Sequence, residues 1–159
     1  MELEVADSRH NSQSHRHVVS ERTRRQVAEK KCILVIEDDA LSQKLFRDLL
    51  EFQGYDVEHT DNSLQVFRIL RNSTIHLIIM DIKLPMVSGL ELAHRIKEDE
   101  YLKNIPIVAV TAFAMKGDRE RIIGAGCDAY ISKPIDMKIF LQTVGRFLDG
   151  IARDEAGSG

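Results

Sequence analysis

The sequence lacks the features that mark several large classes of protein. It has no apolar run near the ~20 residues that a membrane-spanning helix requires, and its start, from Met1 to Val5, has neither the basic residues nor the apolar core of a secretory signal. Cysteine is scarce: Cys32 and Cys127 are the two in 159 residues. Both adjoin strand-like apolar runs, which favours buried, reduced thiols over a disulfide. We therefore expect a cytoplasmic protein without a membrane segment.

Neither sign of charge dominates. The chain has 22 Lys and Arg against 25 Asp and Glu, a net charge of −3, so neither a nucleic-acid partner nor a membrane surface is expected. Residues 1–30 are rich in Ser, Arg and His and contain no aromatic residue, which predicts a poorly ordered polar tail. Residues 31–150 suffice for a single domain with a substantial core. Residues 151–159 are expected to be a frayed end that leaves no room for a second domain.

Strand-like segments recur along residues 31–150. Four are apolar runs, and the one before Asp81 is apolar at consecutive positions, as expected of a parallel strand buried on both faces; the fifth alternates. In chain order these segments are Cys32–Ile36, Tyr55–His59 (the alternating one), His76–Met80, Pro106–Val110 and Asp128–Ser132.

Segments of helical periodicity separate the strands. The first is an amphipathic helix that ends at Gly54, and its apolar positions are Leu41, Leu45, Leu49 and Phe52, with Phe46 and Leu50 beside them. The other helices are expected around Leu64–Leu70, Leu90–Ile96, Lys116–Gly124 and Ile139–Leu148. Five β–α repeats predict an α/β fold, a doubly wound parallel sheet with helices on both faces.

Reactive side chains follow four of the strands. They are Glu37-Asp38-Asp39, Asp81, Thr111 and Lys133. The carboxyl ends of parallel strands meet at one edge of a sheet, where ligands bind in α/β proteins, so we expect these groups to converge. Clustered acids with a nearby lysine suit a divalent metal and a phosphoryl group.

The predicted cluster suits phosphoryl transfer to a carboxylate. Asp81 is the candidate nucleophile, because an aspartate can form an acyl phosphate. Mg²⁺ prefers carboxylate, water and phosphate oxygens, so Asp38 and Asp81 are expected to bind it directly and Glu37 through a water. Lys133 and the Thr111 hydroxyl would contact phosphate oxygens. Asp39 precedes the first helix, which favours an N-cap role over a fourth acid of the site.

The four segments together resemble the receiver domains of two-component response regulators (CheY-like), and among these most closely the single-domain regulators of cell division. The resemblance covers residues 32–148 and is carried by Val35-Ile36-Glu37-Asp38, Met80-Asp81-Ile82-Lys83-Leu84-Pro85, Val110 to Asp118 and Ala129-Tyr130-Ile131-Ser132-Lys133-Pro134. It implies a flavodoxin-like sheet of strand order 2-1-3-4-5.

The resemblance also implies a role for individual residues. Asp81 is the phosphoacceptor, Glu37 and Asp38 are the acidic pair for Mg²⁺, and the backbone carbonyl of Lys83 completes the metal shell. Thr111 and Lys133 hold the phosphoryl group, and Thr111 forms a switch with Tyr130. Lys83 and Phe113 flank the path of the hydrolytic water and are expected to gate hydrolysis, which favours a long-lived phosphoprotein.

The expected function is therefore phosphorylation-controlled signalling. A histidine kinase or phosphotransfer protein would donate the phosphoryl group, and another protein would read the face of the fourth helix, fifth strand and fifth helix. Beyond self-phosphorylation and slow autodephosphorylation, no enzyme activity is expected. A phosphatase of the haloacid-dehalogenase type is the alternative. Such an enzyme requires a second aspartate two residues after the nucleophile, and this position is occupied by Lys83. A flavodoxin-like cofactor carrier is disfavoured because Glu37-Asp38-Asp39 would repel the FMN phosphate.

Overall fold

The computed structural model of the protein describes residues 29–112 and 115–150. The expectations for the tail over 1–28, for the end over 151–159 and for Phe113 therefore lie outside the described residues. Among the helices of the described part, none is long and apolar enough to cross a membrane.

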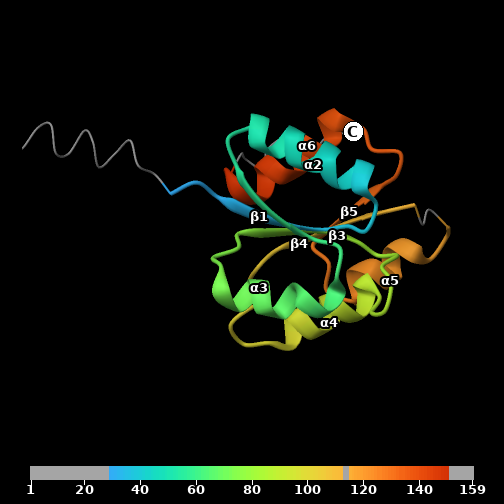
Figure 1. The fold of residues 1–159 in the computed structure, drawn as a ribbon. Helices are drawn as coiled ribbons and strands as arrows, with labels where there is room; N and C mark the ends of the chain where they lie inside the picture. Colours follow the sequence, from blue (N-terminus) through green and yellow to red (C-terminus); the bar gives the residue numbers. More distant parts are fainter. Residues whose placement is uncertain (1–28, 113–114, 151–159) are drawn as a thin grey trace, which may run out of the picture. The chain divides into compact units, whose positions relative to one another are not determined.

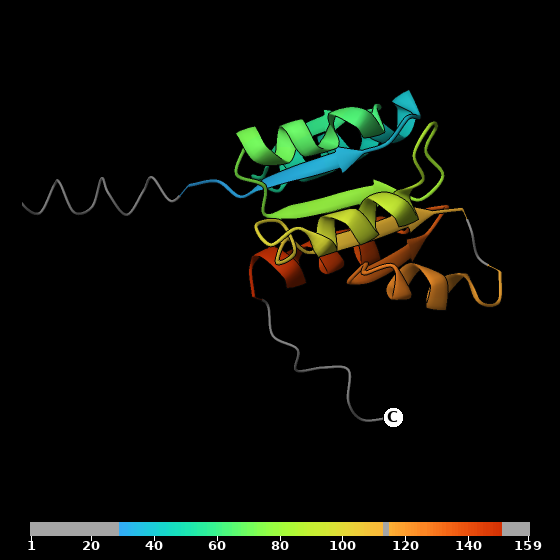
Figure 2. The ribbon, with the colours of Figure 1, turned by 90° about the horizontal axis from the view of Figure 1, so that it is seen from below.

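The centre of the domain is one sheet of five parallel strands in the order β2-β1-β3-β4-β5. This order confirms the predicted flavodoxin-like fold. The strands are β1 (Cys32–Ile36), β2 (Asp56–Thr60), β3 (Leu77–Asp81), β4 (Ile107–Thr111) and β5 (Ala129–Ser132). Figure 2 shows the strand arrows pointing toward the same edge of the sheet. At their ends, Asp81 and Thr111 are the last residues of β3 and β4, whereas Glu37 and Lys133 come directly after β1 and β5.

Helices cover both faces of this sheet (Figure 1). On one face lie α2 (Ala40–Phe52) and α6 (Met137–Leu148). On the other lie α3 (Val66–Asn72), which follows the short 3₁₀ turn η1 (Ser63–Gln65), then α4 (Gly89–Glu98) and α5 (Asp118–Gly124). The doubly wound architecture predicted from the β–α repeats is confirmed.

The core has two halves because successive side chains of a strand point to opposite faces of a sheet. Along β1, Leu34 belongs to the half that includes residues of α3, α4 and α5, whereas Ile33 and Val35 belong to the half that includes residues of α2 and α6. In that second half, the rings of Phe46 and Phe140 stack with centroids 5.3 Å apart. All residues of β3 and β4 are buried, which explains their continuous apolar sequence.

Helix α2 begins and ends as its sequence predicts. The Asp39 carboxylate accepts a hydrogen bond from the Ser42 N–H at 2.8 Å, which confirms the N-cap. After the helix, Gly54 has a φ of 92°. The N–H groups of Gly54 and Tyr55 bond back to the carbonyls of Glu51 and Leu50, the Schellman arrangement that favours glycine at this position.

The prediction of which apolar residues bury α2 against the sheet is wrong for three of them. Phe46 and Leu50 are the buried residues of the helix, Leu49 is partly buried, and Leu41, Leu45 and Phe52 are exposed. The helix has apolar residues on two sides, and the sheet can bury only one of them. Leu64 and Ile139, which begin two other expected helical segments, are also more than half exposed, at 60% and 52%.

The two cysteines differ in their surroundings. Both are free thiols, so the prediction against a disulfide is confirmed. Cys127 is buried, as expected, but Cys32 is partly exposed because it stands at the first position of β1, where the strand emerges from the core.

Candidate functional site

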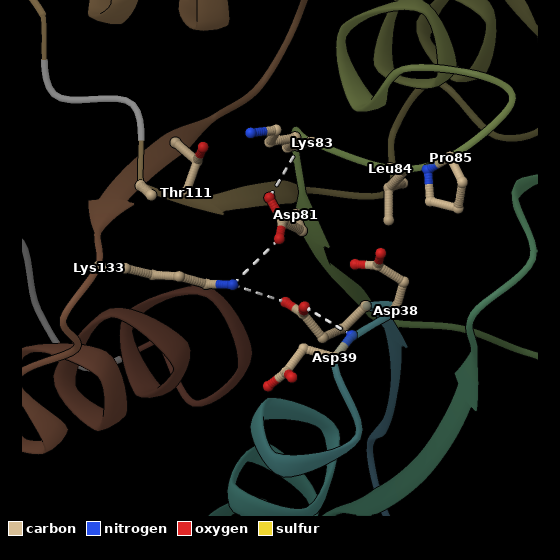
Figure 3. Close-up of a pocket in the computed structure, with 10 residues that line it drawn as sticks. Asp38, Asp39, Asp81, Lys83, Leu84, Pro85, Thr111 and Lys133 are labelled. Atoms are coloured by element: carbon tan, nitrogen blue, oxygen red, sulfur yellow. Dashed lines mark hydrogen bonds and ion pairs between the residues drawn. The ribbon is translucent and has the colours of Figure 1, made fainter.

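A cavity of about 580 Å³ opens at the carboxyl ends of the central strands. It combines most of the residues that the sequence singles out (Figure 3). Its lining consists of Glu37, Asp38, Asp39, Asp81, Lys83, Leu84, Pro85, Thr111, Ala112 and Lys133. The predicted convergence of acids, hydroxyl and ammonium at one edge of the sheet is confirmed as geometry.

Asp81 is the last residue of β3, and it is only 8% exposed. One carboxylate oxygen, Oδ1, accepts a hydrogen bond from the backbone N–H of Lys83 at 2.9 Å. The other, Oδ2, lies 3.0 Å from the ammonium nitrogen of Lys133. Two donors therefore fix the orientation of the carboxylate.

The start of α4 packs closely against the backbone of Asp81 and Ile82. Gly89 donates its N–H to the Ile82 carbonyl at 2.9 Å. A Cβ at position 89 would lie 2.5 Å from the carbonyl oxygen of Asp81 and 2.7 Å from the Ile82 Cα. A glycine is required there because any side chain would push the helix away from the end of the strand.

Lys133 connects two buried acids. Its Nζ lies 3.0 Å from Glu37 Oε2 and 3.0 Å from Asp81 Oδ2, and Figure 3 shows the side chain extending across the pocket. The lysine follows β5, where its backbone N–H donates to the Thr111 carbonyl at 2.9 Å. The Lys133–Pro134 peptide is cis, a form that X-Pro bonds tolerate far better than other peptide bonds.

Burial and the ion pair have opposite effects on the pKa values of Glu37 and Lys133. Burial raises the pKa of the Glu37 carboxyl above its usual value, although the hydrogen bond from Lys133 acts in the other direction. Burial alone would lower the pKa of the Lys133 ammonium, but its hydrogen bonds to Asp81 and Glu37 outweigh burial and raise it. Lys133 is therefore a firmly charged counter-ion for the two acids.

Three carboxylates could hold a metal ion. One oxygen each of Glu37, Asp38 and Asp81 lies within 4.8 Å of the others, and Asp38 is the exposed member. Oxygen ligands of this kind fit Mg²⁺, which is usually bound by one or two carboxylates and completes its shell with water and phosphate oxygens. Asp39 lines the same pocket, but its carboxylate caps α2, and this hydrogen bond with Ser42 lowers the pKa of Asp39.

The two predicted switch residues lie on neighbouring strands. Thr111 is fully buried at the end of β4 and lines the pocket. Tyr130 pairs in register with Ala109, two residues before Thr111, and its partly buried ring packs against the half of the core that includes residues of α5. Tyr130 is thus outside the pocket lining but one strand away from it.

Gln43 is a site residue that sequence reasoning missed. Its side-chain amide donates to the main-chain carbonyl of Glu37, which ties the first turn of α2 to the acidic segment. A polar residue in a first helical turn gives no signal of such a contact. Leu84 and Pro85 also line the pocket; they belong to the motif that carries the family resemblance, but no role in the site was predicted for them.

Fold and site together define the class of protein. Residues 33–145 match the family model described as response regulator receiver domain, and the chain belongs to this family. It is 50% identical over 118 residues to the polar-differentiation response regulator DivK of Brucella anthropi, an alignment that covers 74% of this chain and 96% of that protein.

Solved receiver structures show the same fold. The receiver domain of a Pseudomonas aeruginosa sensor histidine kinase, solved with a magnesium ion coordinated in its active-site cleft, is 30% identical, with a TM-score of 0.68 and coverage of 74% of this chain and 97% of that one. The receiver domain of the Saccharomyces cerevisiae response regulator Ssk1, solved in complex with the histidine phosphotransfer protein Ypd1, is 25% identical, with a TM-score of 0.68 and coverage of 74% and 88%.

Proposed function

We propose that this response regulator accepts a phosphoryl group on Asp81 and signals by changing a protein-binding face. The observation that carries the proposal is the Asp81 carboxylate itself. It stands at the end of a buried strand with one oxygen 3.0 Å from the Lys133 ammonium, and an oxygen of it lies within 4.8 Å of oxygens from two further acids.

The reaction is a transfer between two nucleophiles. An Asp81 oxygen forms the new bond to phosphorus while the bond between phosphorus and the donor atom breaks. The donor atom is the nitrogen of a phosphohistidine or the acyl oxygen of a small acyl phosphate. Because charge spreads over the equatorial oxygens, positioning and neutralisation supply the catalysis. Asp38 and Asp81 would hold Mg²⁺ with the Lys83 carbonyl, and Glu37 through water; the ion would neutralise phosphoryl oxygens.

Each remaining pocket group has a part in this proposal. The Lys83 N–H fixes one Asp81 oxygen and so orients the other. Lys133 already lies against Asp81, so its ammonium would follow the phosphoryl oxygens after transfer. Thr111 lines the same cavity, so its hydroxyl could donate to a phosphoryl oxygen.

The response would spread from Thr111 to the neighbouring strand. Movement of the Thr111 side chain toward the phosphoryl group changes the packing around β4, and the ring of Tyr130 on β5 turns inward in response. The altered face comprises α5, β5 and α6. This face has exposed apolar residues for a protein reader, among them Ile123, Met137 and Ile139.

The partners follow from the family and the relatives. We propose a histidine kinase or a histidine phosphotransfer protein as donor, supported by the yeast receiver complex, and a protein reader in the cytoplasm. The likeness to DivK supports a role in cell-cycle or division control. Catalysis would be limited to self-phosphorylation and slow autodephosphorylation, with Lys83 and Phe113 as the residues that gate the attacking water.

Phosphorylation with acetyl phosphate, followed by intact-mass measurement, tests the site. Wild type should gain one phosphoryl adduct in the presence of Mg²⁺ and none with a chelator. Asp81→Asn should gain none. Asp39→Asn is the matched control, because Asp39 lines the pocket but caps α2, and it should still be labelled. Full labelling of Asp81→Asn contradicts the proposal.

A further inference from the structure

The loop after Asp81 contains a residue in an unusual backbone conformation. Met86 has a φ of 70°, and among the residues that the structure describes it is the one non-glycine with a positive φ. Values in this range favour glycine, asparagine or aspartate. Met86 is also the centre of a three-residue turn, because the Val87 N–H donates to the Pro85 carbonyl at 2.9 Å. A γ-turn with positive φ is rare and strained.

The Ser63 hydroxyl holds this turn in place. Ser63 is only 3% exposed, and its hydroxyl donates to the same Pro85 carbonyl oxygen at 3.3 Å. Met86 is 77% exposed, so the packing of its own side chain contributes little. Rotation of the peptide between Pro85 and Met86 would bring the φ of Met86 to a negative value, but it would turn the carbonyl away from Ser63. The hydroxyl therefore opposes the relaxation of a strained backbone.

The loop after β2 thereby connects two walls of the pocket. At one end of this loop, the Thr60 carbonyl accepts a hydrogen bond from the Glu37 N–H at 3.2 Å. Three residues later, Ser63 donates to Pro85, which lines the pocket on the side where Asp38 lies (Figure 3). One short segment therefore fixes the acidic residues after β1 relative to the wall that follows β3.

We propose that Ser63 is a positioning residue for the pocket, whose hydroxyl holds the Pro85–Met86 peptide and so keeps the wall from Lys83 to Pro85 in the conformation that accepts Mg²⁺. The inference rests on the proposed function, but Ser63 acts from outside the pocket lining. A segment that samples two conformations binds its ligand only in the competent fraction, and the apparent Kd rises accordingly. Loss of the hydroxyl should therefore weaken Mg²⁺ binding although no metal ligand is removed.

Calorimetric titration with MgCl₂ and amide hydrogen exchange test the role of Ser63. In Ser63→Ala the Kd for Mg²⁺ should rise about fivefold, a size typical of one hydrogen bond, and the Val87 amide should exchange faster. Gln65→Ala, at an exposed position of the same 3₁₀ turn, is the matched control and should behave as wild type. A wild-type Mg²⁺ affinity in Ser63→Ala overturns the proposal.

Met86→Gly separates positioning from a general loss of stability. Glycine adopts positive φ about as readily as negative φ, so in this background the turn depends less on the hydroxyl. Adding Ser63→Ala to Met86→Gly should then raise the Kd by at most about twofold, because roughly half of the molecules keep the competent turn. The same loss of affinity in both backgrounds indicates a merely structural serine and also overturns the proposal.

The titration requires no phosphoryl group, so the inference and the proposed function can fail separately. If Ser63→Ala weakens Mg²⁺ binding as expected but acetyl phosphate does not label Asp81 in wild type, the proposed function fails and the role of Ser63 at the metal site stands. If Asp81 is labelled and Ser63→Ala binds Mg²⁺ as wild type does, only the inference fails.

Discussion

Lys133 and Asp81 are 52 residues apart in the chain, yet the ammonium nitrogen of Lys133 lies 3.0 Å from Asp81 Oδ2. The same nitrogen lies 3.0 Å from Glu37 Oε2, across 96 residues. One cation thus balances two buried acids that would otherwise repel each other. This shared counter-ion is the basis of the first prediction.

Lys133→Ala should destabilise the domain, because Glu37 and Asp81 then lose their common partner. Breaking a fully buried pair costs 3–5 kcal/mol, but the Lys133 side chain is 23% exposed, so a loss on the order of 2 kcal/mol is expected. Urea unfolding measures this loss, and Mg²⁺ should restore part of it. Lys138→Ala, at an exposed position of α6, should have little effect. Equal stability of the two variants contradicts the shared counter-ion.

Gly89→Ala should reduce both stability and phosphorylation, since its Cβ would collide with the Asp81 carbonyl. A cost of roughly 1–3 kcal/mol is typical of overpacking. Gly124→Ala is the matched control: a Cβ at this helix position meets no atom within 4 Å, and alanine in helices favours stability by roughly 0.5–1 kcal/mol. Thermal unfolding and the acetyl phosphate assay should therefore separate the two variants.

Phosphorylation should change the amide chemical shifts of α5, β5 and α6 more than those of α3. The proposed cause is the coupled movement of Thr111 and Tyr130. Thr111→Ala should accept phosphate yet lose most of the shift changes beyond β4. Heteronuclear NMR spectra with and without the phosphoryl group provide the measurement. Unchanged amide chemical shifts over residues 115–140 in the phosphorylated wild type would contradict the proposed switch.

The acyl phosphate should decay faster in a variant that combines Lys83→Asn with Phe113→Glu. These changes introduce groups that can orient water beside the phosphoryl group, whereas lysine and phenylalanine favour holding the phosphate or excluding water. Positioned acid–base groups contribute 10²–10⁴-fold, so an acceleration of roughly tenfold is a modest expectation. Following the loss of the phosphoryl adduct over time gives the rate, and an equal or slower rate refutes gating.

The two thiols should react at different rates with a disulfide reagent. Burial raises the pKa of Cys127 to about 12, and burial also raises the pKa of Cys32, which stays partly exposed. At pH 8, Cys32 should react first and Cys127 only on unfolding, with Cys127→Ser as the control. Because the folded pKa of Cys127 is above the unfolded value of 9.0, its contribution to stability is complete below about pH 9 and falls as pH rises toward 12.

The sequence predicts the fold well because its signals are local or repeated. Apolar runs predict the strands, and a reactive residue after each run predicts the pocket, since parallel strands end at one edge. The burial of α2 was not predictable in the same way. Periodicity identifies apolar sides of a helix but does not tell which side meets the sheet, so Leu41 and Phe52 were assigned to the core.

Contacts that depend on exact three-dimensional position were also beyond the sequence. The bond from Gln43 to the Glu37 carbonyl depends on how α2 leaves the first strand. The bridging of Glu37 and Asp81 by one lysine depends on the distances between the ends of β1, β3 and β5. The convergence of the reactive residues at one edge of the sheet was predictable, but the individual hydrogen bonds and ion pairs between them were not.

The strand order has a consequence for the newly made chain. Ribosomes make Glu37 and Asp81 first, whereas Lys133, which neutralises them, follows β5, an edge strand and the last of the five in chain order. Until β5 docks on β4, the acids lack the Lys133 ammonium that contacts both of them in the folded domain. Under the proposed function, competence to accept a phosphoryl group therefore arises only with the completion of the sheet.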